Sequence, residues 1–334
     1  MTRLVQLQNG AQRRVALVEE PHLRLLEGVA SVYDLVREAA ASNGSLVALA
    51  RRRATAETLD YEPIYAGRSS WRLLAPIDHP VDAARCLVSG TGLTHLGSAK
   101  NRAAMHAAAT SATETDSMKM FRWGVEAGRP AAGAIGIAPE WFFKGVGSIL
   151  RGPNDPLPVP PYAEDGGEEA EIAGVYFVDD AGQPRRIGMA IGNEFSDHKF
   201  EKKNYLNLAG SKVRPCSLGP ELAIDPGFKS VPGRVAIERS GRVVWSKDIA
   251  TGEAEMSHSL ANLEHHHFKF ESHRRPGDVH VHYYGACALS FGDGFLLQDG
   301  DVMVVAFEGF GRALRNPLAV AGTPAVPVVV RSLA

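Results

Sequence analysis

Three glutamates, Glu169, Glu171 and Glu194, are the residues of this sequence best suited to chemistry. Glu169 and Glu171 are two positions apart at the start of an apolar run that ends at Val178, a pattern that predicts a strand. Side chains two apart in a strand point to the same face, so both carboxylates should look the same way. Three convergent carboxylates repel one another unless a cation lies among them, and oxygen ligands favour Mg²⁺, Mn²⁺ or Ca²⁺ over zinc. The alternative is a polar strand edge carrying three solvated glutamates.

A hairpin is expected to bring these carboxylates together. Asp179-Asp180-Ala181-Gly182 has the composition of a turn, and residues 187–191 are predicted to form the returning strand. A hairpin symmetric about Gly182 and Gln183 places Glu194 opposite Glu171.

The residues around the glutamates resemble the fumarylacetoacetate hydrolase family, whose signature is an E-x-E pair on a strand followed by G-N-D-x-S. Here the two motifs are Glu169-Ala170-Glu171 and Gly192-Asn193-Glu194-Phe195-Ser196. Further family-like segments follow in the family's order between residues 73 and 317: Trp141-Phe142-Phe143-Lys144, Gly152-Pro153-Asn154-Asp155-Pro156, Ser217-Leu218-Gly219-Pro220, Pro276-Gly277-Asp278-Val279, Asp299-Gly300-Asp301-Val302 and Gly309-Phe310-Gly311. The resemblance implies an α+β fold, with a small α/β region over residues 1–72 and a catalytic, mixed β-roll domain with the metal site over residues 73–334.

Composition favours a cytoplasmic protein with no nucleic-acid or membrane partner. The chain has 334 residues, 45% hydrophobic and 22% charged, with a formal net charge of −2, enough for one large domain or two smaller ones. It has no long basic run. Its N-terminus lacks an apolar signal core, and no stretch approaches the ~18 apolar residues of a membrane span. The three scattered cysteines have neither a zinc-site spacing nor the pattern of a disulfide framework.

Local patterns predict the elements around the site. An opening hairpin is expected over residues 4–7 and 14–18, with helices over residues 32–40 and 46–56, the second with a basic face. Residues 85–102 should contain a buried strand and a glycine-rich turn. Helices are expected over residues 103–109 and 117–127, and the polar residues 113–117 could cap the latter.

The sequence departs from the family at the water-activating pair. The family segment G-L-N-Y-x-x-H-x-x-E supplies a His–Glu pair for carbon–carbon bond hydrolysis, and the aligned positions here hold Ser98 and Asn101. Neither can act as a general base near neutral pH without a separate activator. His95, three residues earlier, could substitute, or it could be a histidine bonded to backbone. Glu114 or Asp116 could be a replacement base, or these residues could only cap a helix.

Two lysines are candidate substrate ligands. Lys144 follows a Trp-Phe-Phe run, so its stem should lie in an apolar wall, and the resemblance implies that its ammonium faces the metal; an exposed lysine is the alternative. The family's second lysine aligns with Gly210, and Lys212 lies two positions late. The family's S-x-R arginine aligns with His198, and its T-G-T-P motif is replaced by residues 282–285.

Histidines are frequent near the C-terminal end of the chain. Three consecutive histidines, residues 265–267, would point in different directions on a helix, whereas structural zinc needs four convergent ligands. An ordinary helix is expected there. His280 and His282 should share one face of a strand, lining a pocket or lying outside.

A Mg²⁺ held by the three glutamates suits a 2-oxo acid, because the cation can act as a Lewis acid and stabilise an enolate. Without the hydrolytic pair, elimination is favoured, and the turn at residues 92–99 and the segment 115–121 resemble the family's sugar-acid branch. The resemblance implies dehydration of a 2-keto-3-deoxy-pentonate, derived from L-arabonate or D-xylonate, to 2,5-dioxopentanoate. Catalytic roles are expected for Lys144, Ser98 and Glu114, and substrate binding for His95, Lys212, Ser98 and Lys144. Two alternatives are an acylpyruvate hydrolase that uses His95 and a catalytically silent sugar-acid-binding protein, and a homodimer or dimer of dimers is expected.

Overall fold

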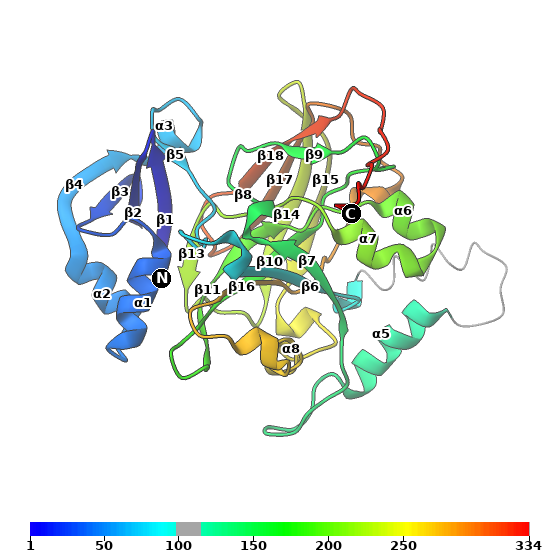
Figure 1. Cartoon of the computed structure of the whole chain (residues 1–334), viewed down its shortest axis with the longest axis horizontal. Helices are drawn as coiled ribbons and strands as arrows, with labels where there is room; N and C mark the ends of the chain where they lie inside the picture. Colours follow the sequence, from blue (N-terminus) through cyan, green and yellow to red (C-terminus); the bar gives the residue numbers. More distant parts are fainter. Residues whose placement is uncertain (98–114, 334) are drawn as a thin grey trace.

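The computed structural model describes residues 1–97 and 115–333 (Figure 1). Strands predominate in these residues, so the chain has the mixed α and β composition that was predicted. The larger sheet has the strand order β4-β3-β2-β1-β13-β11-β10-β16-β6-β7, and the smaller sheet has the order β15-β14-β17-β18-β9. Among the described residues, none of the helices is both long and apolar enough to cross a bilayer.

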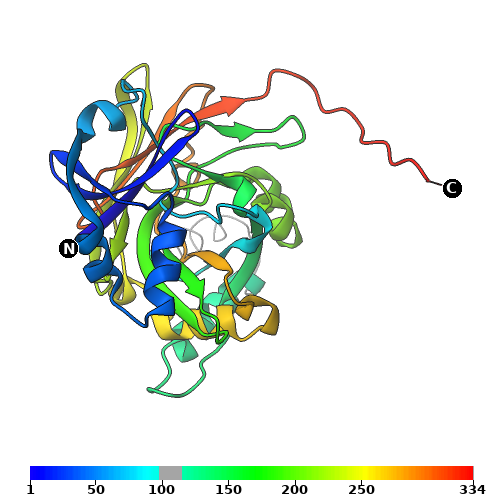
Figure 2. The same ribbon diagram turned by 60° about the vertical axis from the view of Figure 1, so that its left-hand side comes forward.

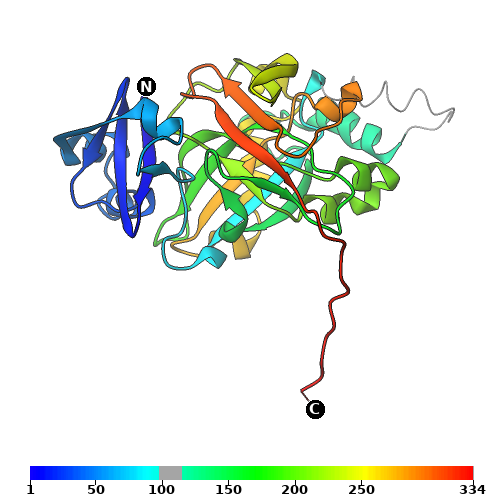
Figure 3. The ribbon, with the colours of Figure 1, turned by 90° about the horizontal axis from the view of Figure 1, so that it is seen from above.

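The N-terminal strands form one end of the larger sheet (Figure 3). The predicted opening hairpin is confirmed, with Asn9 paired to Gln12 across the turn. The elements of the N-terminal part of the chain are β1 (Thr2–Asn9), β2 (Gln12–Glu19), β3 (His22–Leu26), α1 (Val32–Ala41), α2 (Leu46–Arg53), β4 (Ala54–Asp60), α3 (Tyr61–Tyr65) and β5 (Arg72–Leu73).

The helix predicted over residues 46–56 is too long. Helix α2 ends at Arg53, and the next residue, Ala54, is extended and pairs with Leu26 of β3. Thr58 pairs with Arg24 in the same ladder. Pairing with an open strand edge therefore outweighs the helix propensity of the preceding run.

The middle of the larger sheet carries the glutamate hairpin, β10 (Ala170–Val178) and β11 (Pro184–Asn193). Strand β10 pairs with β16 (Val279–Tyr283), which runs parallel to β6 (Cys86–Gly92). The remaining strands of this sheet are β7 (Glu140–Val146), β8 (Leu150–Arg151), β12 (Cys216–Leu218) and β13 (Leu222–Ile224); those of the smaller sheet are β9 (Leu157–Val159), β14 (Val231–Arg239), β15 (Arg242–Thr251), β17 (Val302–Phe307) and β18 (Leu314–Val320).

Both faces of β10 are covered, which is why every residue of this strand is buried. Ala173 and Val175 pack in one apolar core with residues of α1, and Ile172 packs in a second core with the smaller sheet and α8 (Leu260–Phe268). Alternation along the strand puts Glu171 on the face of Ala173.

Three further helices lie at the side of the sheet that holds β7 (Figure 1). They are α5 (Asp116–Ala127), α6 (His198–Lys203) and α7 (Leu208–Lys212). The predicted cap of α5 is confirmed, since the Thr115 hydroxyl accepts a hydrogen bond from the Met118 amide. The helix predicted over residues 103–109 lies outside the described residues. At the other end of the chain, residues after β18 extend away from the body (Figure 2).

Candidate metal centre and active site

The hairpin places Glu194 opposite Glu169. Glu171 pairs with Gly192, and the Glu194 amide donates to the Glu169 carbonyl at 3.0 Å. The expectation that Glu194 returns opposite Glu171 is therefore wrong by two positions.

Two local features explain this register. The turn closes earlier than expected, with the Asp179 amide donating to the Gln183 carbonyl and Val178 pairing with Pro184. This turn alone would displace the pairing by three residues, and a register shift between Val175 and Tyr176 moves it back by one, which leaves the net difference of two.

The three carboxylates nevertheless lie together. One oxygen from each of Glu169, Glu171 and Glu194 lies within 4.8 Å of the others. Their exposed fractions are 7%, 1% and 0%, so they are not a solvated strand edge. Two of them come from β10 or the residue before it, and Glu194 follows β11 directly.

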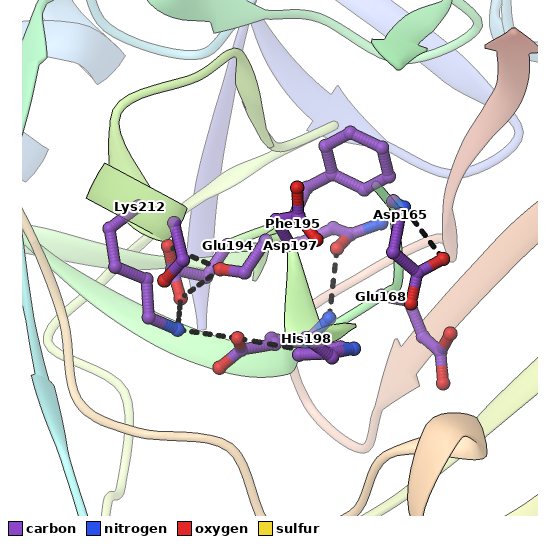
Figure 4. Close-up of polar contacts among 12 residues, drawn as sticks. Asp165, Glu168, Glu194, Phe195, Asp197, His198 and Lys212 are labelled. Atoms are coloured by element: carbon purple, nitrogen blue, oxygen red, sulfur yellow. Dashed lines mark hydrogen bonds and ion pairs between the residues drawn. The ribbon is translucent and has the colours of Figure 1, made fainter. Parts of the chain in front are cut away.

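Lys212 lies between two of these carboxylates. Its Nζ is 2.5 Å from Glu169 Oε1 and 2.6 Å from Glu194 Oε2 (Figure 4). Helix α7 ends at this lysine, so the side chain reaches the carboxylates although its position in the sequence is two residues later than the family lysine. The ammonium also lies 5.0 Å from the centre of the Phe142 ring, a cation–π contact.

Lys144 lies beneath Glu194 and is fully buried. Its Nζ forms an ion pair with Glu194 Oε1 and donates to the carbonyls of Phe195 and Lys212, both at 2.9 Å. An ammonium has three hydrogens to donate, and these contacts use all three.

The carboxylates differ in electrostatic surroundings. Burial raises the pKa of Glu171 well above its ordinary value, and repulsion from Glu194 and Glu169 raises it further. At Glu169 the effect of burial is outweighed by the charge of Lys212 and by the hydrogen bond from His198, so its pKa is well below the ordinary value. Glu171 accepts a hydrogen bond from the Gly285 amide at 2.7 Å, and none of the ammonium groups in the described chain forms an ion pair with it.

This arrangement fits a hard divalent cation. Glu171 is the one of these three carboxylates that no ammonium group of the described chain pairs with, and its raised pKa indicates that positive charge is missing beside it. Carboxylate oxygens are the ligands that Mg²⁺ and Ca²⁺ take in proteins. Glu169, Glu171 and Glu194 would hold the ion.

His95 lies behind this site. Its Nε2 is 2.7 Å from the Thr251 hydroxyl and its Nδ1 is 3.1 Å from the Thr94 hydroxyl. Burial lowers the pKa of His95 to about 4. Gly285, whose amide binds Glu171, lies between His95 and the glutamates. A Cβ added at Gly285 would lie 2.1 Å from Thr94 Oγ1.

The other predicted catalytic residues, Ser98 and Glu114, lie outside the described residues, as does Asn101. Asp116, the alternative base, begins α5 with a side chain that is 82% exposed and pairs with Lys119 at 2.9 Å. It lies in the position of an ordinary first-turn carboxylate.

His198 is a site residue whose contact the sequence did not reveal. Its Nε2 is 3.1 Å from Glu169 Oε1, and it is the first residue of α6 (Figure 4). The preceding residue, Asp197, caps α6 and pairs with buried Arg214 at 3.2 Å. The only sequence signal was that His198 occupies the place of the family's arginine.

Comparisons with known proteins bear on the fold. No family model matches the sequence, and no curated protein matches it. Among solved structures, the apo form of a 2-keto-3-deoxy-D-arabinonate dehydratase matches with a TM-score of 0.71 at 18% sequence identity, over 96% of this chain and 100% of that one. A 2-keto-3-deoxy-D-arabinonate dehydratase complexed with magnesium and 2,5-dioxopentanoate matches with a TM-score of 0.70 at 18% identity, over 96% and 99%.

A fumarylacetoacetate hydrolase from psychrophilic Exiguobacterium antarcticum also matches, with a TM-score of 0.61 at 18% identity, over 96% of this chain and 100% of that one. These matches span nearly the whole chain. The chain therefore has the fold of the fumarylacetoacetate hydrolase superfamily.

Proposed function

We propose that this protein is a divalent-metal-dependent hydro-lyase that converts a 2-keto-3-deoxy-pentonate to 2,5-dioxopentanoate. The observation that carries the proposal is the buried group of Glu169, Glu171 and Glu194 with Lys212 between two of them. The fold that holds this group is shared with a dehydratase complexed with magnesium and 2,5-dioxopentanoate.

The reaction removes one water and leaves the oxidation level of the substrate unchanged. A base removes a proton from C3, and the C4 hydroxyl leaves with a proton, which forms a C3=C4 double bond beside the 2-keto group. Loss of a C5 proton and return of a proton to C3 move the double bond to C4=C5. The resulting enol takes a proton at C4 and becomes the aldehyde.

The bound cation would supply a Lewis acid for the 2-keto group, which makes the C3 proton more acidic. Lys212, whose ammonium contacts Glu169 and Glu194, is proposed to offer positive charge to the substrate carboxylate. Lys144 remains a candidate for substrate contact, but its three existing contacts favour a role in positioning Glu194 and the backbone of Lys212. Ser98 is proposed to hydrogen-bond substrate hydroxyls, and Glu114 to act as the base.

A hydrolase that cleaves acylpyruvates with His95 as base is the second candidate. Both ring nitrogens of His95 face threonine hydroxyls, which favours the lyase over this alternative.

Incubation with Mg²⁺ and a panel of 2-keto-3-deoxy-pentonates and acylpyruvates tests the proposal. We expect 2,5-dioxopentanoate from at least one pentonate, and loss of this activity on chelation. Faster cleavage of an acylpyruvate than dehydration of any pentonate would favour the hydrolase. Binding of these acids without turnover of any of them would favour a binding protein.

We also propose that residues 73–334 form a mixed β-roll domain that pairs two copies of the chain, with residues 1–72 as a small N-terminal α/β region. The apolar segment that extends beyond β18, with Val326, Val328 and Val330 at least 84% exposed, supports association with another copy. Light scattering on purified protein should give the mass of a dimer or tetramer, and a monomer would contradict the pairing.

A further inference from the structure

Four buried histidines form a cluster that the proposed reaction does not use. His267 comes from α8, His273 from the short helix η5 (Glu271–Arg274), and His280 and His282 from β16. Their exposed fractions are 1%, 7%, 0% and 0%. One nitrogen from each of His267, His273 and His280 lies within 4.8 Å of the others.

The cluster is separated from the glutamates by the larger sheet. On β16, Val281 and Tyr283 pack in the same apolar core as Ala173, on the face to which Glu171 belongs. His280 and His282 alternate with them and therefore point to the opposite face, where α8 lies.

We propose that His267, His273 and His280 bind a transition-metal ion such as Zn²⁺, at a second site distinct from the three glutamates. The ion would join α8 and η5 to β16. Imidazole nitrogen suits Zn²⁺, Co²⁺, Ni²⁺ and Cu²⁺, whereas Mg²⁺ prefers oxygen, so the two sites would select different ions.

The contacts within the cluster resemble those of a metal site before the ion is bound. His267 Nε2 and His280 Nδ1 face each other at 2.9 Å, so one proton must lie between them. A metal ion can take the place of that proton. His273 Nδ1 donates to the His267 carbonyl at 2.7 Å, which leaves its Nε2 with a free lone pair. Metal-binding histidines commonly donate their other nitrogen to a carbonyl in this way.

Hydrogen bonding alone does not satisfy this cluster. The Nε2 atoms of His280 and His282 are buried and have no hydrogen-bond partner within the part of the chain that is described. Buried polar atoms are nearly always paired. An ion between His267 Nε2 and His280 Nδ1 would lie on the other side of the His280 ring from its Nε2, so the two unpaired Nε2 atoms show only that the described chain leaves the cluster unsatisfied. His282 lies next to the three ligands, with its ring centre 4.4 Å from that of His267.

The imidazoles are neutral, the form that binds metals. Burial and the neighbouring histidines lower the pKa of His267 well below its ordinary value and that of His280 to about 3. Burial likewise lowers the pKa of His273.

Trp141 provides a specific test of metal binding at His267. Its Nε1–H is 3.3 Å from His267 Nδ1, and an indole can only donate. An ion on His267 Nε2 requires the proton on Nδ1, where Ser89 Oγ at 3.3 Å can accept it. The indole N–H then loses its acceptor, so Trp141 opposes metal binding, and Trp141→Phe should strengthen it.

The test uses the full chain with excess Mg²⁺ present, and titrates it with Co²⁺ followed by visible spectroscopy and with Zn²⁺ followed by equilibrium dialysis. We expect one equivalent of each ion, with the visible bands of four-coordinate Co²⁺, in which water takes the position that the three histidines leave open. His273→Ala and His280→Ala should weaken binding by at least ~100-fold, more than loss of an outer-shell partner causes. Trp141→Phe should bind several-fold more tightly, which a variant that merely damages folding would not do.

Two controls separate this site from its surroundings. His265→Ala changes an exposed histidine on the same helix and should leave Co²⁺ binding unchanged. Glu171→Gln should weaken Mg²⁺ binding and leave the Co²⁺ spectrum unchanged. Absence of the Co²⁺ bands from the wild-type protein, or equal loss of binding in His265→Ala and His273→Ala, would show that the cluster is only a buried hydrogen-bonded core.

Discussion

At the scale of single residues, charge balance dominates the glutamate site. Glu171 is the carboxylate that lacks an ammonium partner within the described chain, so it should depend most on a bound cation. Glu171→Gln keeps the shape and removes the charge. We expect Mg²⁺ affinity and dehydratase activity to fall by orders of magnitude, measured by calorimetric titration and product formation. In chelated protein the same change should raise stability near neutral pH, because folding no longer has to protonate a buried carboxylate whose pKa is raised. Full activity of chelated wild-type protein would contradict the metal requirement.

The two lysines should have separable effects. Lys144→Ala leaves the Glu194 carboxylate without one of its buried ion pairs, which typically destabilises by about 3–5 kcal/mol. Lys212→Ala breaks two buried ion pairs and should also destabilise the fold, but it should in addition raise KM, since its ammonium is proposed to contact the substrate. Urea unfolding and steady-state kinetics on both variants distinguish these outcomes. Lys203, whose pair with Glu164 is exposed, provides the control, and Lys203→Ala should change neither quantity. A loss of kcat/KM in Lys144→Ala with unchanged stability would indicate that Lys144 contacts the substrate directly.

Buried neutral histidines should make the fold sensitive to acid. The pKa of His95 and that of His258 are lowered to about 4, from an ordinary value of 6.5. Between these values the unfolded chain binds protons that the folded chain does not. Their stabilising effect is therefore complete above pH 6.5 and declines as the pH falls to about 4, by up to ~1.4 kcal/mol per pH unit for each histidine.

Urea unfolding of metal-free protein between pH 7 and pH 4 measures this slope. His95→Gln should reduce it by one histidine's share, while His265→Ala, which changes an exposed residue, should not. Identical slopes in wild type and His95→Gln would show that His95 is protonated in the folded state.

At the scale of elements, the segment that follows β16 completes the site through its backbone. Gly285 has φ +108°, a conformation that favours glycine, and an added Cβ would lie 2.1 Å from Thr94 Oγ1. Gly285→Ala should displace the amide that binds Glu171 and reduce metal affinity and kcat together. Gly292→Ala is the matched control on the same segment, because nothing lies within 4 Å of its added Cβ. Similar kinetics for both variants would show that this backbone contact does not contribute to metal binding or catalysis.

At the scale of the whole molecule, the same fold occurs in a dehydratase and in a hydrolase, so the fold alone does not determine the reaction. Ser98 and Asn101 occupy the places of the family's hydrolytic pair. Ser98→His with Asn101→Glu should lower dehydration and raise acylpyruvate cleavage, compared in the same assay. For the unmodified protein in D₂O, we expect solvent deuterium in the product, because protons return to carbon during the reaction. Product without deuterium would rule out the proposed proton transfers.

Local features of the fold could be predicted from the amino-acid sequence. The strand that carries Glu169 and Glu171, the turn after Val178, the opening hairpin and the cap at Thr115 all follow from propensity and spacing over a few residues. The motif order also led to the correct superfamily fold, because it extends over most of the chain.

Features that depend on contacts between distant residues could not be predicted in this way. The position of the turn and a register shift in the hairpin placed Glu194 opposite Glu169, and α7 brought Lys212 to the carboxylates although it lies two positions after the family's lysine in the alignment. The histidine cluster likewise joins a helix, a short helical turn and a strand. No local pattern encodes these arrangements, because strand register and helix position are set by packing against distant residues.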